Sequence, residues 1–246
     1  CGVVLVGDKT VLNAIPMFAE SEISQEDAWR LLSNRLVESL RDSTNDGYPA
    51  LKLCLDLATS LLVFFGRFEA GYAARVRAME RLVSEVSEGN IPVPAAELLP
   101  VLRKCTNAKL NSSSEAMDEQ TAKTIRAWAW QAWAWELAQL TGARTEPPEE
   151  MIRALGHKLP WSSRLRGWAF TACRIGWPRS IAHWPRWCWL FAKGFTPRYA
   201  VYLSAYECRA GAANNIRDLL PVRDNGSDAA RQIEWNYKEF VVDTRA

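Results

Sequence analysis

The chain has little of what most catalytic and metal sites are built from. It contains only two histidines, His157 and His183, so a histidine metal site or a Ser-His triad would have to use those two alone. It has no P-loop, no dinucleotide-binding glycine motif, no nucleophile elbow and no zincin motif. We therefore expect no metal site and no catalytic residue within this chain.

Paired cysteines and long hydrophobic runs are also lacking. The six cysteines are dispersed singly, without a C-x-x-C pair, which is typical of free thiols in a reducing compartment. The longest nearly uncharged apolar run, Leu57 to Phe65, is well short of the ~20 residues that a membrane span needs. We expect a cytoplasmic protein without a transmembrane segment.

An initiating methionine is missing at the first position. The chain begins Cys-Gly-Val-Val-Leu-Val-Gly-Asp, where the run Val3 to Val6 has the character of a β-strand that a Gly-Asp turn ends. This beginning predicts a fragment that has lost its true start. We expect a short N-terminal strand remnant, with further sequence before Cys1.

What the chain does have is helical periodicity and an apolar content of 48%, enough for a full core. Apolar residues recur every three to four positions from Gln25 to Arg41, and a second helix that begins near Pro49 is apolar around most of its circumference. We expect an all-α protein of two packed helical lobes, residues 1–106 and 115–246, joined by a polar linker at 107–114.

Four tryptophans fall in one expected helix, about Glu115 to Leu140. At about 100° per residue, Trp128 and Trp135 share one side while Trp130 and Trp133 share the other. Both sides therefore need burial. This pattern indicates a helix that is central to a bundle.

The charges of this nearly neutral chain are segregated. Residues 151–206 contain no Asp or Glu and nine Lys or Arg, so this stretch carries +9, and a formal total of +2 leaves −7 for the rest. Arginines alternate with tryptophans there, which suits single-stranded nucleic acid. The candidate patch for an anionic partner is Arg164, Arg166, Arg174, Arg179 and Arg186.

Two other interpretations of this stretch stay open. The tryptophans can form a helical core that the arginines cover, with their charged ends in solvent or turned toward the acidic half. The aromatic residues can also form a face that lies on a membrane surface.

Lys52 and Asp56 interrupt the apolar second helix, where they share one stripe with Thr59 and Ser60. A simple i,i+4 ion pair on a solvent stripe explains them. The alternative explanation is a lysine presented to a phosphate group. The stripe must in either case face something polar.

Several segments carry a family resemblance. They are Val-Leu-Val-Gly-Asp-Lys-Thr near the start, Leu31-Leu-Ser-Asn-Arg35, Leu51-Lys-Leu-Cys-Leu-Asp-Leu-Ala-Thr-Ser-Leu-Leu, and Gly66-Arg-Phe-Glu-Ala-Gly-Tyr72. Over residues 1–80 the chain resembles bacterial nucleotidyltransferase-like proteins, in which a helical domain follows a small catalytic α/β domain. The resemblance implies that Lys52 contacts phosphate, and that Asn34, Arg35 and Asp56 lie near a domain interface.

Such enzymes hold Mg²⁺ and a nucleoside triphosphate through a Gly-Ser turn and an Asp-x-Asp pair, which this chain lacks. The resemblance therefore implies a catalytic domain before Cys1, and no cofactor in this chain. Our first hypothesis is the helical, substrate-side portion of a nucleotidyltransferase-like protein, inactive alone. The alternative is a noncatalytic all-α binding module whose basic lobe engages an anionic partner such as nucleic acid.

Overall fold

A computed structural model describes residues 22–41, 48–111, 117–143, 145–212, 216, 218–222 and 228–242. Within these ranges the regular structure consists of helices, with no strand. The prediction of an all-α protein is confirmed. The expected strand at Val3 to Val6 lies outside the described residues.

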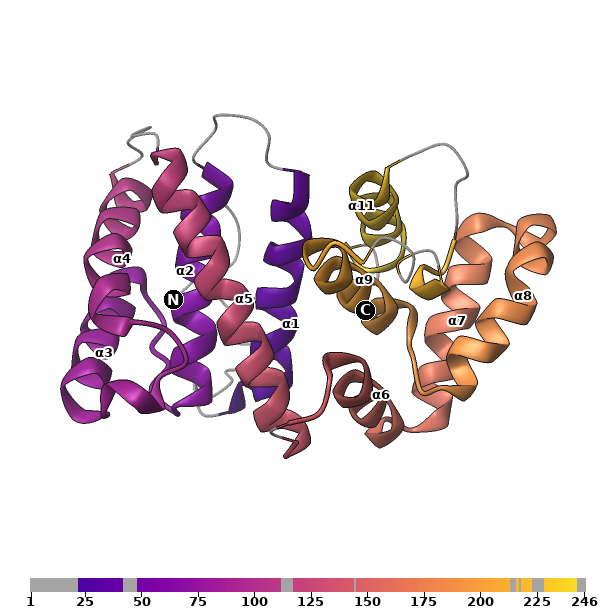
Figure 1. Ribbon diagram of the computed structural model, residues 1–246, viewed down its shortest axis with the longest axis horizontal. Helices are drawn as coiled ribbons and strands as arrows, with labels where there is room; N and C mark the ends of the chain where they lie inside the picture. Colours follow the sequence, from indigo (N-terminus) through magenta and orange to yellow (C-terminus); the bar gives the residue numbers. More distant parts are fainter. Residues whose placement is uncertain are drawn as a thin grey trace, which may run out of the picture.

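The helices of the described residues divide into an N-terminal bundle and a C-terminal half (Figure 1). The bundle consists of α1 (Gln25–Glu38), η3 (Ser39–Arg41), α2 (Tyr48–Phe64), α3 (Tyr72–Glu85), η4 (Glu88–Asn90), α4 (Ala95–Leu110) and α5 (Glu119–Thr141). The C-terminal half consists of α6 (Pro148–Lys158), α7 (Trp161–Ile175), α8 (Trp177–Ala192), α9 (Pro197–Arg209) and α11 (Ala229–Phe240).

Helices α1, α2 and α5 pack against one another at the centre of the bundle, and α3 and α4 pair at its outer edge. The start of α1 is fixed by Ser24, whose Oγ accepts a hydrogen bond from the backbone N–H of Asp27 at 3.0 Å. Helix α2 is buried along most of its circumference, as its apolar sequence predicts.

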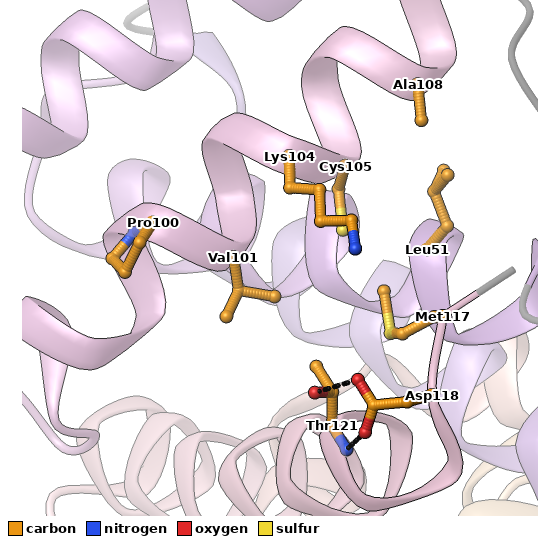
Figure 2. A pocket seen from close by; sticks show the side chains of 9 residues that line it. All are labelled: Leu51, Pro100, Val101, Lys104, Cys105, Ala108, Met117, Asp118 and Thr121. Carbon is orange, nitrogen blue, oxygen red and sulfur yellow. Dashed lines mark hydrogen bonds between the residues drawn. The ribbon is translucent and has the colours of Figure 1, made fainter. Parts of the chain in front are cut away.

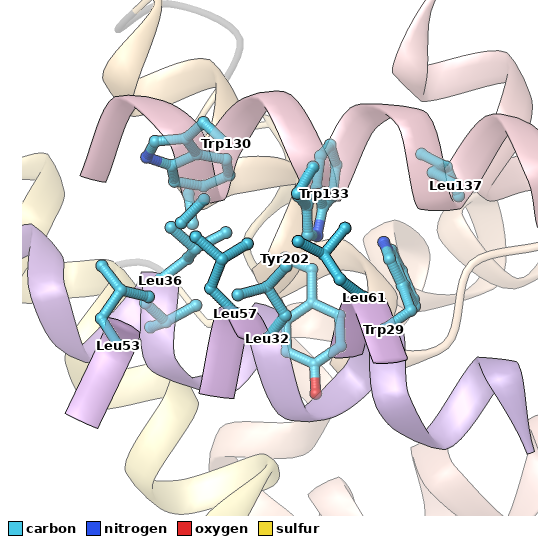
Figure 3. Close-up of a cluster of buried hydrophobic side chains, with 14 of the residues drawn as sticks. Trp29, Leu32, Leu36, Leu53, Leu57, Leu61, Trp130, Trp133, Leu137 and Tyr202 are labelled. Atoms are coloured by element: carbon cyan, nitrogen blue, oxygen red, sulfur yellow. The ribbon is translucent and has the colours of Figure 1, made fainter. Parts of the chain in front are cut away.

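The junction between the two halves is built from aromatic residues. The ring of Trp29 on α1 lies 5.6 Å from that of Trp133 on α5, and 5.8 Å and 5.6 Å from those of Tyr199 and Tyr202 on α9. The Trp133 indole N–H donates to the Ser33 hydroxyl at 2.8 Å. Figure 3 shows Trp29, Trp133 and Tyr202 among the leucines of the bundle. The buried apolar residues of both halves therefore form one continuous core.

The boundary between the halves differs from the one that the polar residues 107–114 predict. Residues 107–110 belong to α4, and α5 packs against α1 and α2 of the bundle as well as against α6 of the C-terminal half. Trp130 and Trp133 of α5 are buried, whereas Trp128 and Trp135 are half-buried. The chain leaves the bundle after α5, because the apolar side of that helix completes the core of α1 and α2.

The backbone of helix α6 packs closely against the backbone of the turn between α8 and α9. A Cβ atom at Gly156 would lie 1.9 Å from the carbonyl oxygen of Gly194. Gly194 itself has a φ of +91°, a conformation that side chains with a Cβ rarely adopt. Only glycine at position 156 lets the two backbones meet.

Replacing Gly156 by alanine should therefore lower the free energy of unfolding by about 3 kcal/mol, the upper end of what overpacking costs. Chemical denaturation followed by circular dichroism measures this change. The matched control is Gly71→Ala, where the new Cβ would meet only the Ala74 Cβ, at 4.0 Å. Equal stability of the two variants would contradict the backbone contact between α6 and the α8–α9 turn.

The centre of the bundle contains a carboxyl group. Glu136 on α5 is fully buried, and neither of its oxygens has a hydrogen-bond partner among the described residues. Burial raises the pKa of Glu136 to about 8, although the nearby Ser60 hydroxyl acts to lower it. The side chain is therefore mostly protonated and neutral at pH 7.

Glu136 should make the protein less stable as the pH rises. The folded state keeps this proton up to pH about 8, whereas the unfolded state loses it near the ordinary glutamate pKa of 4.5. Between these values the folded state binds more protons, so stability should fall by about 1.4 kcal/mol per pH unit. Urea denaturation from pH 5 to pH 8 measures the slope.

In the variant Glu136→Gln, the free energy of unfolding should change less with pH over this window. The variant should also be more stable than the parent at pH 8, because an amide carries no charge to bury. Glu146→Gln removes an exposed carboxylate and should keep the slope of the parent. A Glu136→Gln slope as steep as that of the parent would show that the buried proton is held elsewhere.

Candidate anion-binding site

A pocket of about 360 Å³ lies where α1, α7, α9 and α11 meet. Three arginines line it, Arg30 from α1, Arg166 from α7 and Arg198 from α9. Its other polar walls are Ser163, Thr196 and Tyr199, and its apolar walls are Leu159, Gly167, Phe170, Pro197 and Phe240. The pocket combines several guanidinium groups with an aromatic and aliphatic surface.

Local sequence features bring α7 and the start of α9 together at this pocket. Thr196 caps α9, since its Oγ1 accepts a hydrogen bond from the N–H of Tyr199 at 3.2 Å, and Pro197 suits the first turn. A Cβ at Gly167 would lie 3.2 Å from the Pro197 ring, so glycine permits this approach. The Trp168 indole N–H donates to the Phe195 carbonyl at 3.0 Å and fixes α7 against the turn.

Arg30 is held in place by the groups around it. Its guanidinium pairs with Glu26 and Asp27 and lies 3.4 Å from the Tyr199 hydroxyl, which itself donates to Glu26. Burial acts to lower the pKa of Arg30, but Tyr199 and the two carboxylates outweigh it and raise that pKa. Arg30 therefore stays charged, with much of its charge already compensated.

Arg166 is the most available of the three cations. Its side chain is exposed, and within the described ranges no carboxylate forms an ion pair with it. A guanidinium in this setting can donate two parallel hydrogen bonds to a phosphate or carboxylate. The hydroxyls of Ser163 and Thr196 can add hydrogen bonds to the same anion.

The five arginines that the sequence groups into one patch lie in different surroundings. Arg164 donates to the Phe191 carbonyl at 3.2 Å and lies over the Phe191 ring, which ties α7 to α8. Arg174 pairs with Glu239 of α11 at 3.2 Å. Arg166 lines the pocket, whereas Arg179 is exposed on α8 and Arg186 is half-buried there. Two of the five therefore hold helices together.

Some tryptophans of the C-terminal half are buried and others are exposed, so a core covered by arginines explains only part of them. Trp168 and Trp187 are buried in the core, as expected of a core that arginines cover. Trp161, Trp177, Trp184 and Trp189 are exposed, which such a core does not explain. The helices α7 and α8 thus present aromatic surface to solvent.

The residues that the resemblance assigns to a phosphate site lie partly together. Arg35 and Lys52 line one small pocket of about 100 Å³ with Glu38, Tyr48 and Pro49. The Lys52 ammonium lies 4.5 Å from the centre of the Tyr48 ring, a cation–π contact. Hydrogen bonding to Lys109, together with the charge of Lys52, lowers the pKa of the Tyr48 hydroxyl.

The expected polar stripe on α2 is not a solvent stripe. Asp56 pairs with Arg35 of α1 rather than with Lys52, and burial raises its pKa despite that arginine. Thr59 and Ser60 are buried, and Thr59 accepts a hydrogen bond from Arg75 at 3.1 Å. The i,i+4 pair fails because α1 and α3 cover this side of α2 and supply their own arginines.

Asn34 lies apart from Lys52. Its side-chain oxygen accepts a hydrogen bond from the Tyr202 hydroxyl at 2.6 Å, so it stands where α1 meets α9. The structure therefore brings Arg35, Asp56 and Lys52 to the contact of α1 with α2, and it places Asn34 at the contact between the two halves.

A second cavity, of about 250 Å³, lies between α2, α4 and the start of α5 (Figure 2). Its lining is largely apolar, with Lys104 and Cys105 on one side and Asp118 on the other. Asp118 caps α5 by accepting hydrogen bonds from the N–H and hydroxyl of Thr121 at 2.8 and 2.6 Å, which lower its pKa. The carboxylate is thus committed to the helix end.

The cysteines and potential metal ligands offer no further site in the part of the chain that is described. Cys54, Cys105, Cys173, Cys188 and Cys208 are free thiols. No cluster of three or more His, Cys, Asp or Glu side chains occurs among the described residues. None of the described helices has the length and apolar character to cross a membrane.

Local sequence patterns predicted Arg166 as part of a basic patch, but they did not predict a pocket shared with Arg30 and Arg198. Arg30 and Tyr199 are brought together from positions 169 residues apart, and local periodicity contains no information on such a contact. Arg198 lies within the acid-free stretch, which was the available signal for it. Arg30 has no comparable signal.

No family model matches this chain, and comparisons with curated proteins and with solved structures gave no match. The resemblance to nucleotidyltransferase-like proteins is neither supported nor contradicted by these comparisons. What the chain does must therefore be argued from the charge, burial and geometry of its own residues.

Proposed function

We propose that this chain is a noncatalytic all-α binding module whose basic half engages a phosphate-bearing partner, with single-stranded nucleic acid as the first choice. The observation that supports this proposal is the pocket lined by Arg30, Arg166 and Arg198. Helix α7 and the start of α9, which line much of the pocket, belong to the acid-free stretch 151–206, and its positive charge attracts an anion over a longer range. The exposed Trp161 at the start of α7 offers a surface on which a base can stack.

Binding of a fluorescent single-stranded oligonucleotide should weaken steeply as salt rises, because each phosphate contact releases counterions. The variant Arg166→Gln should weaken binding and reduce the slope of log K against log salt by about 0.7, the value for one phosphate contact on a single strand. Fluorescence anisotropy at several salt concentrations measures both quantities.

Arg77→Gln is the matched control, since Arg77 is an exposed arginine on α3 of the N-terminal bundle. It should leave the affinity and the slope close to those of the parent. The proposal is wrong if the parent fails to bind at low salt, or if the two variants lose affinity equally.

A second candidate function follows from the small pocket of Arg35 and Lys52. It is the helical, substrate-side portion of a nucleotidyltransferase-like protein, inactive alone, in which Lys52 contacts a nucleotide phosphate. Lys52 is supported in this role because Asp56 pairs with Arg35 and leaves the ammonium to a ring contact. Mg²⁺ and a nucleoside triphosphate would be held by a catalytic domain that this chain lacks.

In the full-length protein, Lys52→Met should then weaken nucleoside triphosphate binding about tenfold, since a charge-assisted hydrogen bond contributes roughly 1.5 to 3 kcal/mol. Isothermal titration calorimetry measures the loss. Lys123→Met, which removes an exposed lysine of α5 that pairs with Glu119, should leave nucleotide binding unchanged. Unaltered nucleotide affinity in the Lys52 variant would remove this residue from the site.

A further inference from the structure

Helix α8 presents one side to solvent that carries no charged residue. The exposed residues on this side, called here the α8 face, are Trp177, Pro178, Ile181, Ala182, Trp184, Pro185, Cys188, Trp189 and Ala192. At about 100° per residue these nine positions fall within one arc of roughly 160°. In most surface helices the side that faces solvent is charged or polar. In α8 this side, which faces solvent, carries no charge.

The exposure of this face is large and continuous. Trp177, Ile181 and Trp184 are exposed by 70%, 61% and 54%, and they follow one another along the helix at spacings of four and three residues. The opposite side of α8 is already satisfied, because Trp187 and Leu190 are buried in the core. The residues of the α8 face are thus not needed for the packing of α8 against the rest of the protein.

A row of cations borders the α8 face along one edge. Arg179, Arg186 and Lys193 recur every seven residues, which places them on one line beside the arc. The Lys193 ammonium lies 4.1 Å from the centre of the Trp189 ring, at the margin of the face. The sequence from Met151 to Tyr206 contains no Asp or Glu. Arg179 is exposed, whereas Arg186 is half-buried and has a partner within the protein.

Charge argues against a second copy of the chain as the occupant. A symmetric contact through the α8 face would place Arg179, Arg186 and Lys193 near their own counterparts, which repel. Nucleic acid also fits this face poorly. A protein that binds nucleic acid places hydrogen-bond donors for the phosphates beside the aromatic residues on which the bases stack. The middle of this arc instead consists of Ile181, Pro185 and other side chains without a donor.

An anionic bilayer surface satisfies both parts of the pattern. Tryptophan is favoured at the level of lipid headgroups, and aliphatic side chains enter the boundary with the acyl chains. Arginine and lysine at the edge of such a helix meet the lipid phosphates.

We propose that the α8 face docks on the surface of an anionic lipid bilayer, with Trp177, Ile181 and Trp184 in the interface and Arg179 and Lys193 against lipid phosphates. Helix α8 then lies along the bilayer plane without crossing it. This inference uses a different surface from the arginine pocket and does not depend on the proposed nucleic acid.

Co-sedimentation with vesicles tests the proposal directly. The protein should bind vesicles of phosphatidylglycerol and phosphatidylcholine, and bind pure phosphatidylcholine at least about tenfold more weakly. The double variant Trp177→Ser, Trp184→Ser should lose about tenfold or more in affinity for the anionic vesicles. Trp235→Ser removes an exposed tryptophan of α11 and should bind as the parent does.

Two further measurements separate insertion from a general charge effect. Arg179→Gln and Lys193→Gln should each reduce vesicle affinity about fivefold, the equivalent of one basic residue near an anionic surface. A polarity-sensitive fluorophore on Cys188, with the other accessible cysteines replaced by serine, should shift to shorter wavelength when anionic vesicles are added.

The proposal is overturned if the parent does not bind anionic vesicles, or if the fluorophore on Cys188 reports no change of environment upon binding. Sedimentation velocity that shows a dimer in the parent and a monomer in the tryptophan double variant would assign the face to self-association instead. Loss of oligonucleotide binding in that variant, with vesicle binding intact, would assign it to nucleic acid.

Discussion

The burial of Trp29 is the constraint on which the two halves of this protein depend. Its ring is fully buried and meets Trp133 of α5 as well as Tyr199 and Tyr202 of α9. A large aromatic side chain dominates the packing around it, so α1, α5 and α9 cannot shift independently. This aromatic contact also positions two walls of the arginine pocket. Arg30 follows Trp29 directly in α1, and Tyr199 both contacts Trp29 and lines the pocket.

Much of the fold could be predicted from the sequence, because its signals are local. The recurrence of Trp29, Leu32 and Leu36 predicted α1, and all three residues are buried. The assignment of α5 to a lobe could not be predicted in this way. Tryptophans on two sides of a helix indicate that it needs neighbours, but they do not identify the neighbours. The polar residues that precede α5 suggested neighbours in the second lobe alone, whereas α5 contacts α1 and α2 as well as α6.

The candidate sites also show that local sequence patterns do not predict contacts between distant parts of the chain. The resemblance groups Asn34, Arg35 and Asp56 at a domain interface. Arg35 and Asp56 form an ion pair between the consecutive helices α1 and α2, whereas Asn34 bonds to Tyr202 of α9. The arginine pocket joins positions 30, 166 and 198, and no spacing rule connects them. Charge counting also overstated the patch, because Arg164 and Arg174 are used to hold α7 against its neighbours. Net charge identifies a region, whereas the tertiary contacts decide which cations a partner can reach.

The two buried tryptophans of the C-terminal half have a consequence for how this sequence can change. The indole N–H of Trp168 donates to the backbone carbonyl of Phe195, and that of Trp187 donates to the carbonyl of Pro221 at 2.8 Å. Every amino acid supplies a backbone carbonyl, so these two bonds place no demand on the side chains at 195 and 221. A substitution at an accepting position therefore leaves the bond itself intact, and what constrains Phe195 is the burial of its own ring. Exchange of either tryptophan for phenylalanine removes the donor and leaves the carbonyl without this bond.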